Sequence, residues 1–132
     1  GKGEWLKKGK DVNILAIGNR VHPALAAAEI LMGKGIDCGV VNMRFLKPLD
    51  TEIIEEALAL TPNLVTVEDN VLAGGFGSAV AEHITDNHLK ASVLRLGIKD
   101  TFVEQATQNE LYRELGLSAE EMAISILNKL KK

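Results

Sequence analysis

The sequence predicts an α/β protein: a three-layer, doubly wound domain around a five-stranded, mostly parallel sheet with one antiparallel edge strand. Short β-branched runs alternate along the chain with longer segments of helical periodicity. These runs are apolar throughout, as expected of strands that are covered on both faces. The chain has 132 residues, of which 46% are hydrophobic and 25% charged, so we expect one domain over residues 1–132.

Four buried strands are predicted from aliphatic and β-branched runs bounded by turn residues: Val12–Ile17, Ile36–Met43, Asn63–Val67 and Ser92–Leu96. A shorter run, Glu4–Lys7, precedes them and is separated from the first by a Lys-Gly-Lys-Asp turn. A parallel return needs a crossover of about a dozen residues. We therefore expect this short strand to pair antiparallel at the edge of the sheet.

Helix signals separate the strands. Pro23 and a run of alanines predict a helix over Val21–Met32, which Gly33 or Gly35 ends. Asp50 has the character of an N-cap, because an acidic first turn and helically spaced apolar residues follow it.

The C-terminal part of the chain continues the pattern. A helix is expected over Ser78–Thr85. Thr107–Glu110 has the form of a capping box and opens a predicted helix over Glu110–Leu115. Ser118 repeats the device and opens a last helix that runs to Lys131.

Composition excludes several classes of protein. The net charge of −3 argues against a nucleic-acid partner, and no segment approaches the ~20 apolar residues that span a bilayer. The single cysteine, Cys38, cannot form an internal disulfide, so a cytoplasmic location is expected. It lies in an apolar run, where we expect a small buried hydrophobe and not a nucleophile. The first residues lack the apolar core of a signal peptide, and they also lack an initiating methionine. This suggests a piece of a longer chain.

Candidate site residues gather where the predicted strands end, because ligands of open parallel sheets bind beyond the carboxyl ends of the strands. The residues there are Asn19, His22, Arg44, Glu68, Asp69, Gly74, Gly75, Gly77 and Ser78. They form no recognisable nucleophile–base pair or metal-ligand set. We therefore assign no catalytic, cofactor-binding or metal-binding residue, and treat these positions as candidate interface or anion contacts.

The glycine turn Gly74–Ser78 has two interpretations. It follows a strand and opens a helix, which is the geometry that cradles phosphates on backbone N–H groups. It matches neither dinucleotide nor P-loop spacing, and the acids Glu68 and Asp69 would repel a phosphate. The alternative is that the glycines permit positive φ and let the backbone pack closely against a neighbour. We favour this alternative.

The other candidates also have two interpretations each. His22 is either a proton carrier or a surface or interface histidine. Glu68 and Asp69 are either a paired-carboxylate site or the solvated start of a loop. Arg44 is predicted to make a directed ion pair with the acids of neighbouring strand ends.

Three segments together resemble a known family. Val41–Asp50 resembles the strand-to-helix motif of the transketolase C-terminal domain, and Val65–Asn70 with Gly74–Val80 resembles its next motif. Leu96–Gln105, with Leu115–Ser118 downstream, is similar to the version of this domain found in 1-deoxy-D-xylulose-5-phosphate synthases. The resemblance covers nearly the whole chain.

This resemblance implies a parent enzyme that condenses pyruvate with glyceraldehyde 3-phosphate and releases CO₂, using thiamine diphosphate and Mg²⁺. Its product feeds isoprenoid, thiamine and pyridoxal synthesis. In the family the cofactor lies between the two preceding domains, and none of their cofactor-binding residues maps onto this sequence. The third domain supports a homodimer and packs against the catalytic domains, so we expect this chain alone to be inactive.

Other functions stay open. Transketolases and the β subunits of 2-oxo acid dehydrogenases share the first two motifs. A free-standing module could hold a small anion near Gly18, Asn19 and the Gly74–Ser78 turn. A stand-alone enzyme would have to use His22 or Glu68.

Overall fold

The computed structural model describes residues 1–68, 75–97 and 118–131 and contains a five-stranded sheet in the order β1-β3-β2-β4-β5. The strands are β1 (Glu4–Lys7), β2 (Val12–Ala16), β3 (Cys38–Asn42), β4 (Asn63–Glu68) and β5 (Ser92–Gly97). The pairs formed by β2, β3, β4 and β5 are parallel, and β1 is antiparallel to β3. The predicted mixed sheet with an antiparallel edge strand is confirmed.

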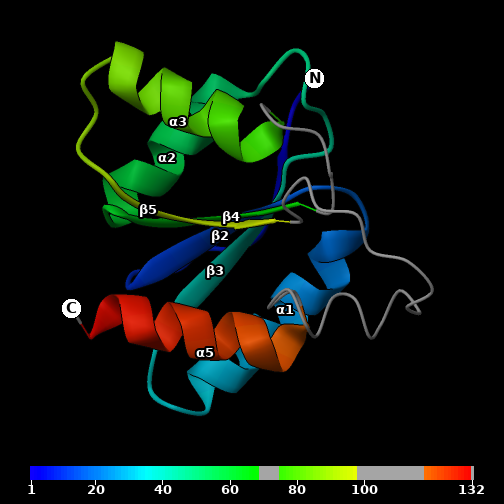
Figure 1. Cartoon of the computed structure of the whole chain (residues 1–132), viewed down its shortest axis with the longest axis vertical. Coiled ribbons are helices and arrows are strands. Elements are labelled where there is room, and N and C mark those ends of the chain that lie inside the picture. The colour runs from blue at the N-terminus through cyan, green and yellow to red at the C-terminus, as the bar shows by residue number, and fades with distance from the viewer. Residues whose placement is uncertain (69–74, 98–117, 132) are drawn as a thin grey trace.

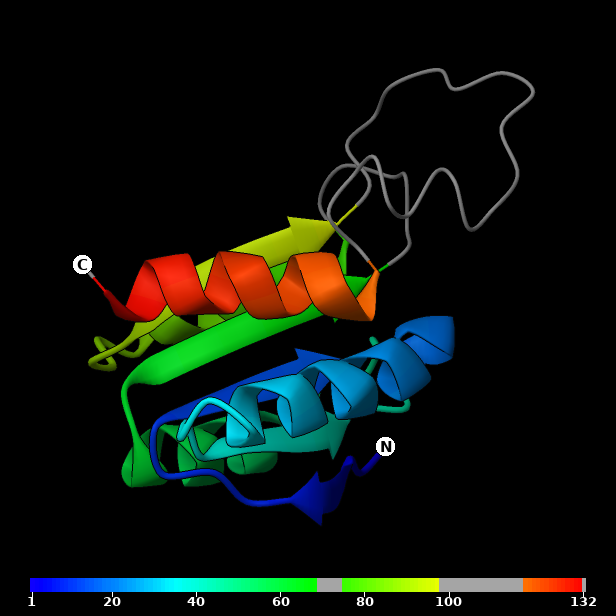
Figure 2. The ribbon, with the colours of Figure 1, turned by 90° about the horizontal axis from the view of Figure 1, so that it is seen from below.

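Helices cover both faces of the sheet. They are the 3₁₀ turn η1 (Gly18–Arg20), α1 (Val21–Met32), α2 (Thr51–Leu60), α3 (Phe76–Asp86) and α5 (Ala119–Leu130). Figures 1 and 2 show α2 and α3 on one face, and α1 and α5 on the other. This is the predicted three-layer, doubly wound arrangement.

The helix expected over Glu110–Leu115 lies outside the described residues. Among the described helices, none has the length and apolar character needed to cross a membrane.

The position of β1 differs from the simplest sequence-based expectation. Its short connection to β2 suggests a hairpin, but β1 pairs with β3, with Glu4 opposite Asn42. The reason is that β3 and β4 occupy both edges of β2, so the outer edge of β3 is the one that remains. The predicted antiparallel pairing at the edge of the sheet is present, and its partner is β3.

A buried asparagine holds the connection from β1 to β2. The side chain of Asn13 is fully buried; its Oδ1 accepts from the Gly9 N–H at 2.9 Å and its Nδ2 donates to the Gly9 carbonyl at 3.0 Å. Gly39 of β3 lies directly against this pair, so that a Cβ there would collide with Asn13 Oδ1 and the Gly9 nitrogen. β1, the connection to β2 and β3 therefore approach one another so closely at Gly39 that only glycine fits there.

The apolar strands supply two cores, one on each face. Ile14 and Val65 pack with α1 and α5, whereas Leu15 and Leu64 pack with α2 and α3. Because successive side chains point to opposite faces, a strand covered on both faces is apolar at every position. This explains why the sequence shows continuous runs and not alternation.

Two predicted helix caps are present. Asp50 Oδ1 accepts from the Ile53 N–H at 3.2 Å, and Ser118 Oγ accepts from the Glu121 N–H at 3.2 Å. Asp50 Oδ2 also accepts from the Gly3 N–H at 2.8 Å, so the same carboxylate fixes the start of the chain against α2. Each cap satisfies a backbone donor that the helix itself leaves free.

We predict that Gly39→Ala lowers the free energy of unfolding by about 3 kcal/mol, because the new methyl group overlaps the Asn13–Gly9 contact. The matched control is Gly33→Ala at the end of α1, where φ is −62° and the nearest atom would lie 3.4 Å from the new Cβ. The control should not lower the free energy of unfolding, because alanine adopts this helical backbone conformation without strain. Urea unfolding of both variants tests this, and equal effects would contradict it.

Candidate functional site

The carboxyl ends of β2 and β4 form the switch point of this fold. The chain leaves β2 through η1 towards α1 on one face, and it leaves β4 towards α3 on the opposite face. In doubly wound sheets ligands bind where neighbouring connections diverge in this way. Asn19, in η1, and Glu68, at the end of β4, lie on the two sides of this point.

Glu68 is the last residue of β4 and caps α3. The residue is 8% exposed; Oε1 of its carboxylate accepts from the Phe76 N–H at 3.0 Å and Oε2 from the Gly77 N–H at 2.6 Å. These N–H groups are the donors that a bound phosphate would use at a helix N-terminus. Glu68 thus fills the anion position with a side chain of the protein itself. It is not the solvated start of a loop, and Asp69, its expected partner, lies outside the described residues.

Gly77 is a close-packing glycine. A Cβ at this position would lie 2.9 Å from Glu68 Oε2, 3.0 Å from Arg95 Nε and 3.1 Å from Thr66 Oγ1. The close approach favoured from the sequence is therefore supported, but positive φ is not the reason, since Gly75 has φ −73° and Gly77 is helical. Gly74 lies outside the described residues.

Arg95 was missed by the sequence analysis. It is an exposed residue of β5, and its Nη2 donates to Ser78 Oγ at 2.6 Å. Parallel pairing sets Arg95 beside Thr66, whose buried hydroxyl has no hydrogen-bond partner among the described residues. A charged residue inside an otherwise apolar run was the available signal. The candidate Ser78 is thereby explained as the acceptor that holds this arginine against α3.

The end of β2 carries a second arginine that was missed. Arg20 is only 7% exposed, and its Nε donates to Asn19 Oδ1 at 3.2 Å. Asn19 thus orients a buried cation at the switch point. His22 is exposed in the first turn of α1, as expected of a surface histidine.

Arg44 follows β3 and is exposed with a positive φ of 64°. Its N–H donates to Asn42 Oδ1 at 3.0 Å, and the next N–H, of Phe45, donates to the Met43 carbonyl at 2.6 Å. This conformation costs a non-glycine residue about 1 kcal/mol or more. Arg44 forms no ion pair with any acid in the described part of the chain, and Asp69 lies outside that part.

Cys38 is the buried hydrophobe predicted from the sequence. It is fully buried, and burial raises its pKa to about 12, with Lys7 opposing and Asp37 adding to this effect. The thiolate that a nucleophile needs is therefore absent near neutral pH. Within residues 1–68, 75–97 and 118–131, no three His, Cys, Asp or Glu side chains gather as a metal site would require.

Comparison with known proteins identifies the family. The profile described as the transketolase C-terminal domain matches residues 1–122. The chain belongs to this family.

The matching relatives are more specific. The chain is 50% identical over 131 residues to a 1-deoxy-D-xylulose-5-phosphate synthase of Synechococcus sp. (strain JA-2-3B'a(2-13)), and 48% identical over 128 residues to the one of Syntrophotalea carbinolica. These matches cover 99% and 97% of this chain but 20% of each relative. The chain therefore matches one domain of these synthases, and spans about a fifth of their length.

Solved structures agree with the fold. A split-gene transketolase, described as an inactive β4 tetramer, superposes with a TM-score of 0.89 at 38% identity, covering 98% of this chain and 42% of that one. A transketolase from Pichia stipitis has a TM-score of 0.67 at 20% identity, covering 98% of this chain and 18% of that one, and shows the shared fold alone.

We predict that Glu68→Gln lowers the free energy of unfolding by about 2 kcal/mol, because an amide offers one acceptor atom to two N–H donors and loses the charge that favours a helix N-terminus. Glu82→Gln, exposed on the same helix, is the matched control and should stay within about 0.5 kcal/mol of the unsubstituted chain. Denaturant midpoints measure both. A Glu68→Gln variant as stable as its control would show that the cap contributes little.

Proposed function

We propose that this chain is the C-terminal domain of a 1-deoxy-D-xylulose-5-phosphate synthase. The whole enzyme would be a transferase that condenses pyruvate with glyceraldehyde 3-phosphate and releases CO₂. The observation that carries the proposal is the 44–50% identity to such synthases over at least 96% of this chain. Its role in that enzyme would be structural: it would pack against the preceding catalytic domains and support a homodimer.

Thiamine diphosphate and Mg²⁺ would be bound by those preceding domains. Two features of the described residues support this assignment. The N–H donors that α3 could offer to a diphosphate already bind the carboxylate of Glu68. No described acidic or histidine cluster could hold the metal ion. The buried, reduced Cys38 is compatible with the cytoplasmic location that we expect of the enzyme.

A transketolase is the alternative parent. The observation that supports this alternative is the superposition on the split-gene transketolase, at 38% identity. The two parents differ in the product that the complete enzyme makes, since only the synthase releases CO₂ from pyruvate. Measuring CO₂ release by the full-length enzyme therefore separates them.

The first test of the proposal is an activity assay. With pyruvate, glyceraldehyde 3-phosphate, thiamine diphosphate and Mg²⁺, the full-length enzyme should form 1-deoxy-D-xylulose 5-phosphate and this chain alone should form none. The reason is that the catalytic groups would lie outside residues 1–132. Product formed by the chain alone would contradict the structural role.

A second test addresses the anion-binding module left open by the sequence. Titration of the chain with millimolar inorganic phosphate, followed by NMR of backbone amides, should leave the signals of Gly18, Phe76 and Gly77 unchanged, because Glu68 competes from within the protein. The Glu68→Gln variant is the matched comparison, since it frees part of the N-terminus of α3. Saturable shifts in the unsubstituted chain would support the anion-binding module.

A further inference from the structure

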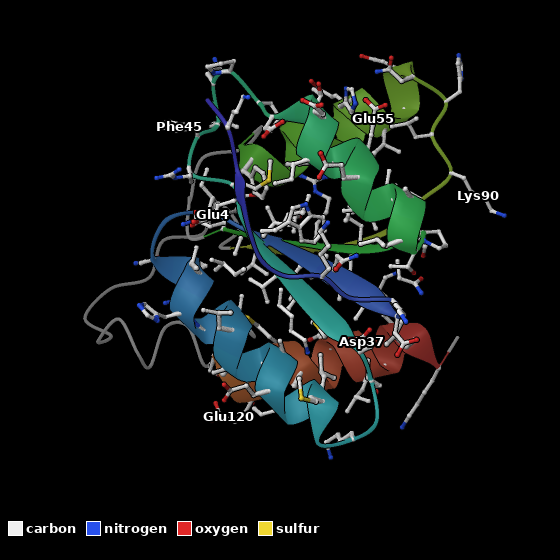
Figure 3. The ribbon with its side chains drawn as sticks, turned by 180° about the vertical axis from the view of Figure 1, so that it is seen from behind. Glu4, Asp37, Phe45, Glu55, Lys90 and Glu120 are labelled. Atoms are coloured by element: carbon white, nitrogen blue, oxygen red, sulfur yellow. The ribbon has the colours of Figure 1, made fainter. Side chains whose placement is uncertain are left out.

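The turn after β3 presents an aromatic side chain to solvent. Phe45 is 48% exposed, whereas Met43, two residues before it, is fully buried. Figure 3 shows Phe45 at the rim of the molecule, beside the start of the N-terminal segment. A half-exposed phenylalanine is a typical anchor residue when a partner provides a pocket for it.

The backbone holds Phe45 in this position. The Phe45 N–H donates to the Met43 carbonyl, which closes a tight turn around Arg44 with its positive φ. The Asn42 side chain fixes the same turn by accepting from the Arg44 N–H at 3.0 Å. Two hydrogen bonds thus keep an unfavourable backbone conformation in which the Phe45 ring is left half exposed. Observed strain of this kind is a reason to look for function.

The first residues of the chain lie against this turn. A Cβ on Gly1 would be 2.6 Å from Phe45 Cδ2, and the Gly3 N–H is bound to Asp50 at the end of the same segment. Under the proposed function, the chain that precedes Gly1 in the longer enzyme would approach this domain beside Phe45.

The charges around Phe45 indicate the partner's chemistry. Arg44 and Lys47 are exposed and flank Phe45 in the sequence. Lys2, also exposed, follows Gly1, whose backbone lies against the ring. Interfaces commonly combine an aromatic anchor with arginine and match a positive rim with a negative one. A suitable partner surface is an apolar hollow with acidic residues at its edge.

We propose that the Arg44–Phe45 turn docks into an acid-rimmed apolar hollow on the domain that immediately precedes this one in the full-length enzyme. The inference rests on the proposed function for the existence of that domain. It identifies the surface of this chain through which the two domains meet.

Alkylation by iodoacetamide tests the contact. Phe45→Cys and Ile124→Cys place thiols at two exposed positions, the second on α5 in the opposite layer, while the native Cys38 is buried and unreactive. In the isolated chain both new thiols should react at similar rates, with circular dichroism showing that the variants fold. In the full-length enzyme, peptide mass spectrometry should show Phe45→Cys slowed at least about ten-fold relative to Ile124→Cys. An unchanged ratio would overturn the proposal.

The alkylation test replaces Phe45 itself, so two further measurements test the same contact with Phe45 in place. Hydrogen exchange of peptides covering residues 43–50, in unsubstituted protein, should be slower in the enzyme than in the isolated chain. Lys47→Glu should restore fast exchange there, whereas Lys90→Glu, exposed elsewhere, should not. Synthase activity is assayed on the same enzyme preparation: its absence contradicts the proposed function, whereas equal exchange in an active enzyme contradicts the docking surface alone.

Discussion

The carboxylate of Glu68 on the N-terminus of α3 determines what the carboxyl edge of this sheet can do. A strand followed by a glycine turn and a helix ordinarily offers free backbone N–H groups to an anion. Here a buried side chain from the strand itself accepts from two of them, at 3.0 and 2.6 Å. Gly77 must then lack a side chain, because a Cβ there would lie 2.9 Å from the carboxylate oxygen Oε2, too close for an unstrained contact. The turn is a packed junction and not an empty cradle.

The neighbouring polar residues follow from this junction. Arg95 approaches Gly77 from β5 and is held by Ser78, so β4, α3 and β5 are joined by side chains as well as by the sheet. On the other side of the switch point, Asn19 binds the buried Arg20. Glu68 and Arg95 therefore connect secondary-structure elements, whereas the Asn19–Arg20 contact lies within η1. Such an arrangement suits a domain that supports a larger enzyme, which is the role proposed for it.

The opposite edge of the sheet has a comparable constraint. Asn13 binds both backbone groups of Gly9, and Gly39 leaves room for this contact. It allows the chain to pass from β1, at the edge, across β3 to β2 in the centre. Because β1 then runs antiparallel, the first residues lie beside the carboxyl end of β3. The start of the chain and the Arg44–Phe45 turn meet there for this reason.

Much of this structure was predictable from local sequence. The strands, α1 and the caps at Asp50 and Ser118 depend on residues close together in the chain, and they were predicted nearly to their bounds. The exception is the burial of β5: this strand was expected to be buried but has no buried residue, because it lies at the edge of the sheet. Family membership was also predictable, because three motifs in the right order carry it. The buried Cys38 followed from the apolar run around it.

The sequence by itself determined the class of fold and the family, because hydrophobic periodicity, caps and motifs are local signals. The tertiary structure alone decided that β1 pairs with β3, that Glu68 caps α3, and that Arg95 reaches Ser78. Each of these depends on which segments the completed sheet brings together. The local sequence around a glutamate at a strand end is the same whether its side chain faces solvent or caps a helix. Only the position of α3 in the folded chain shows that Glu68 is a cap.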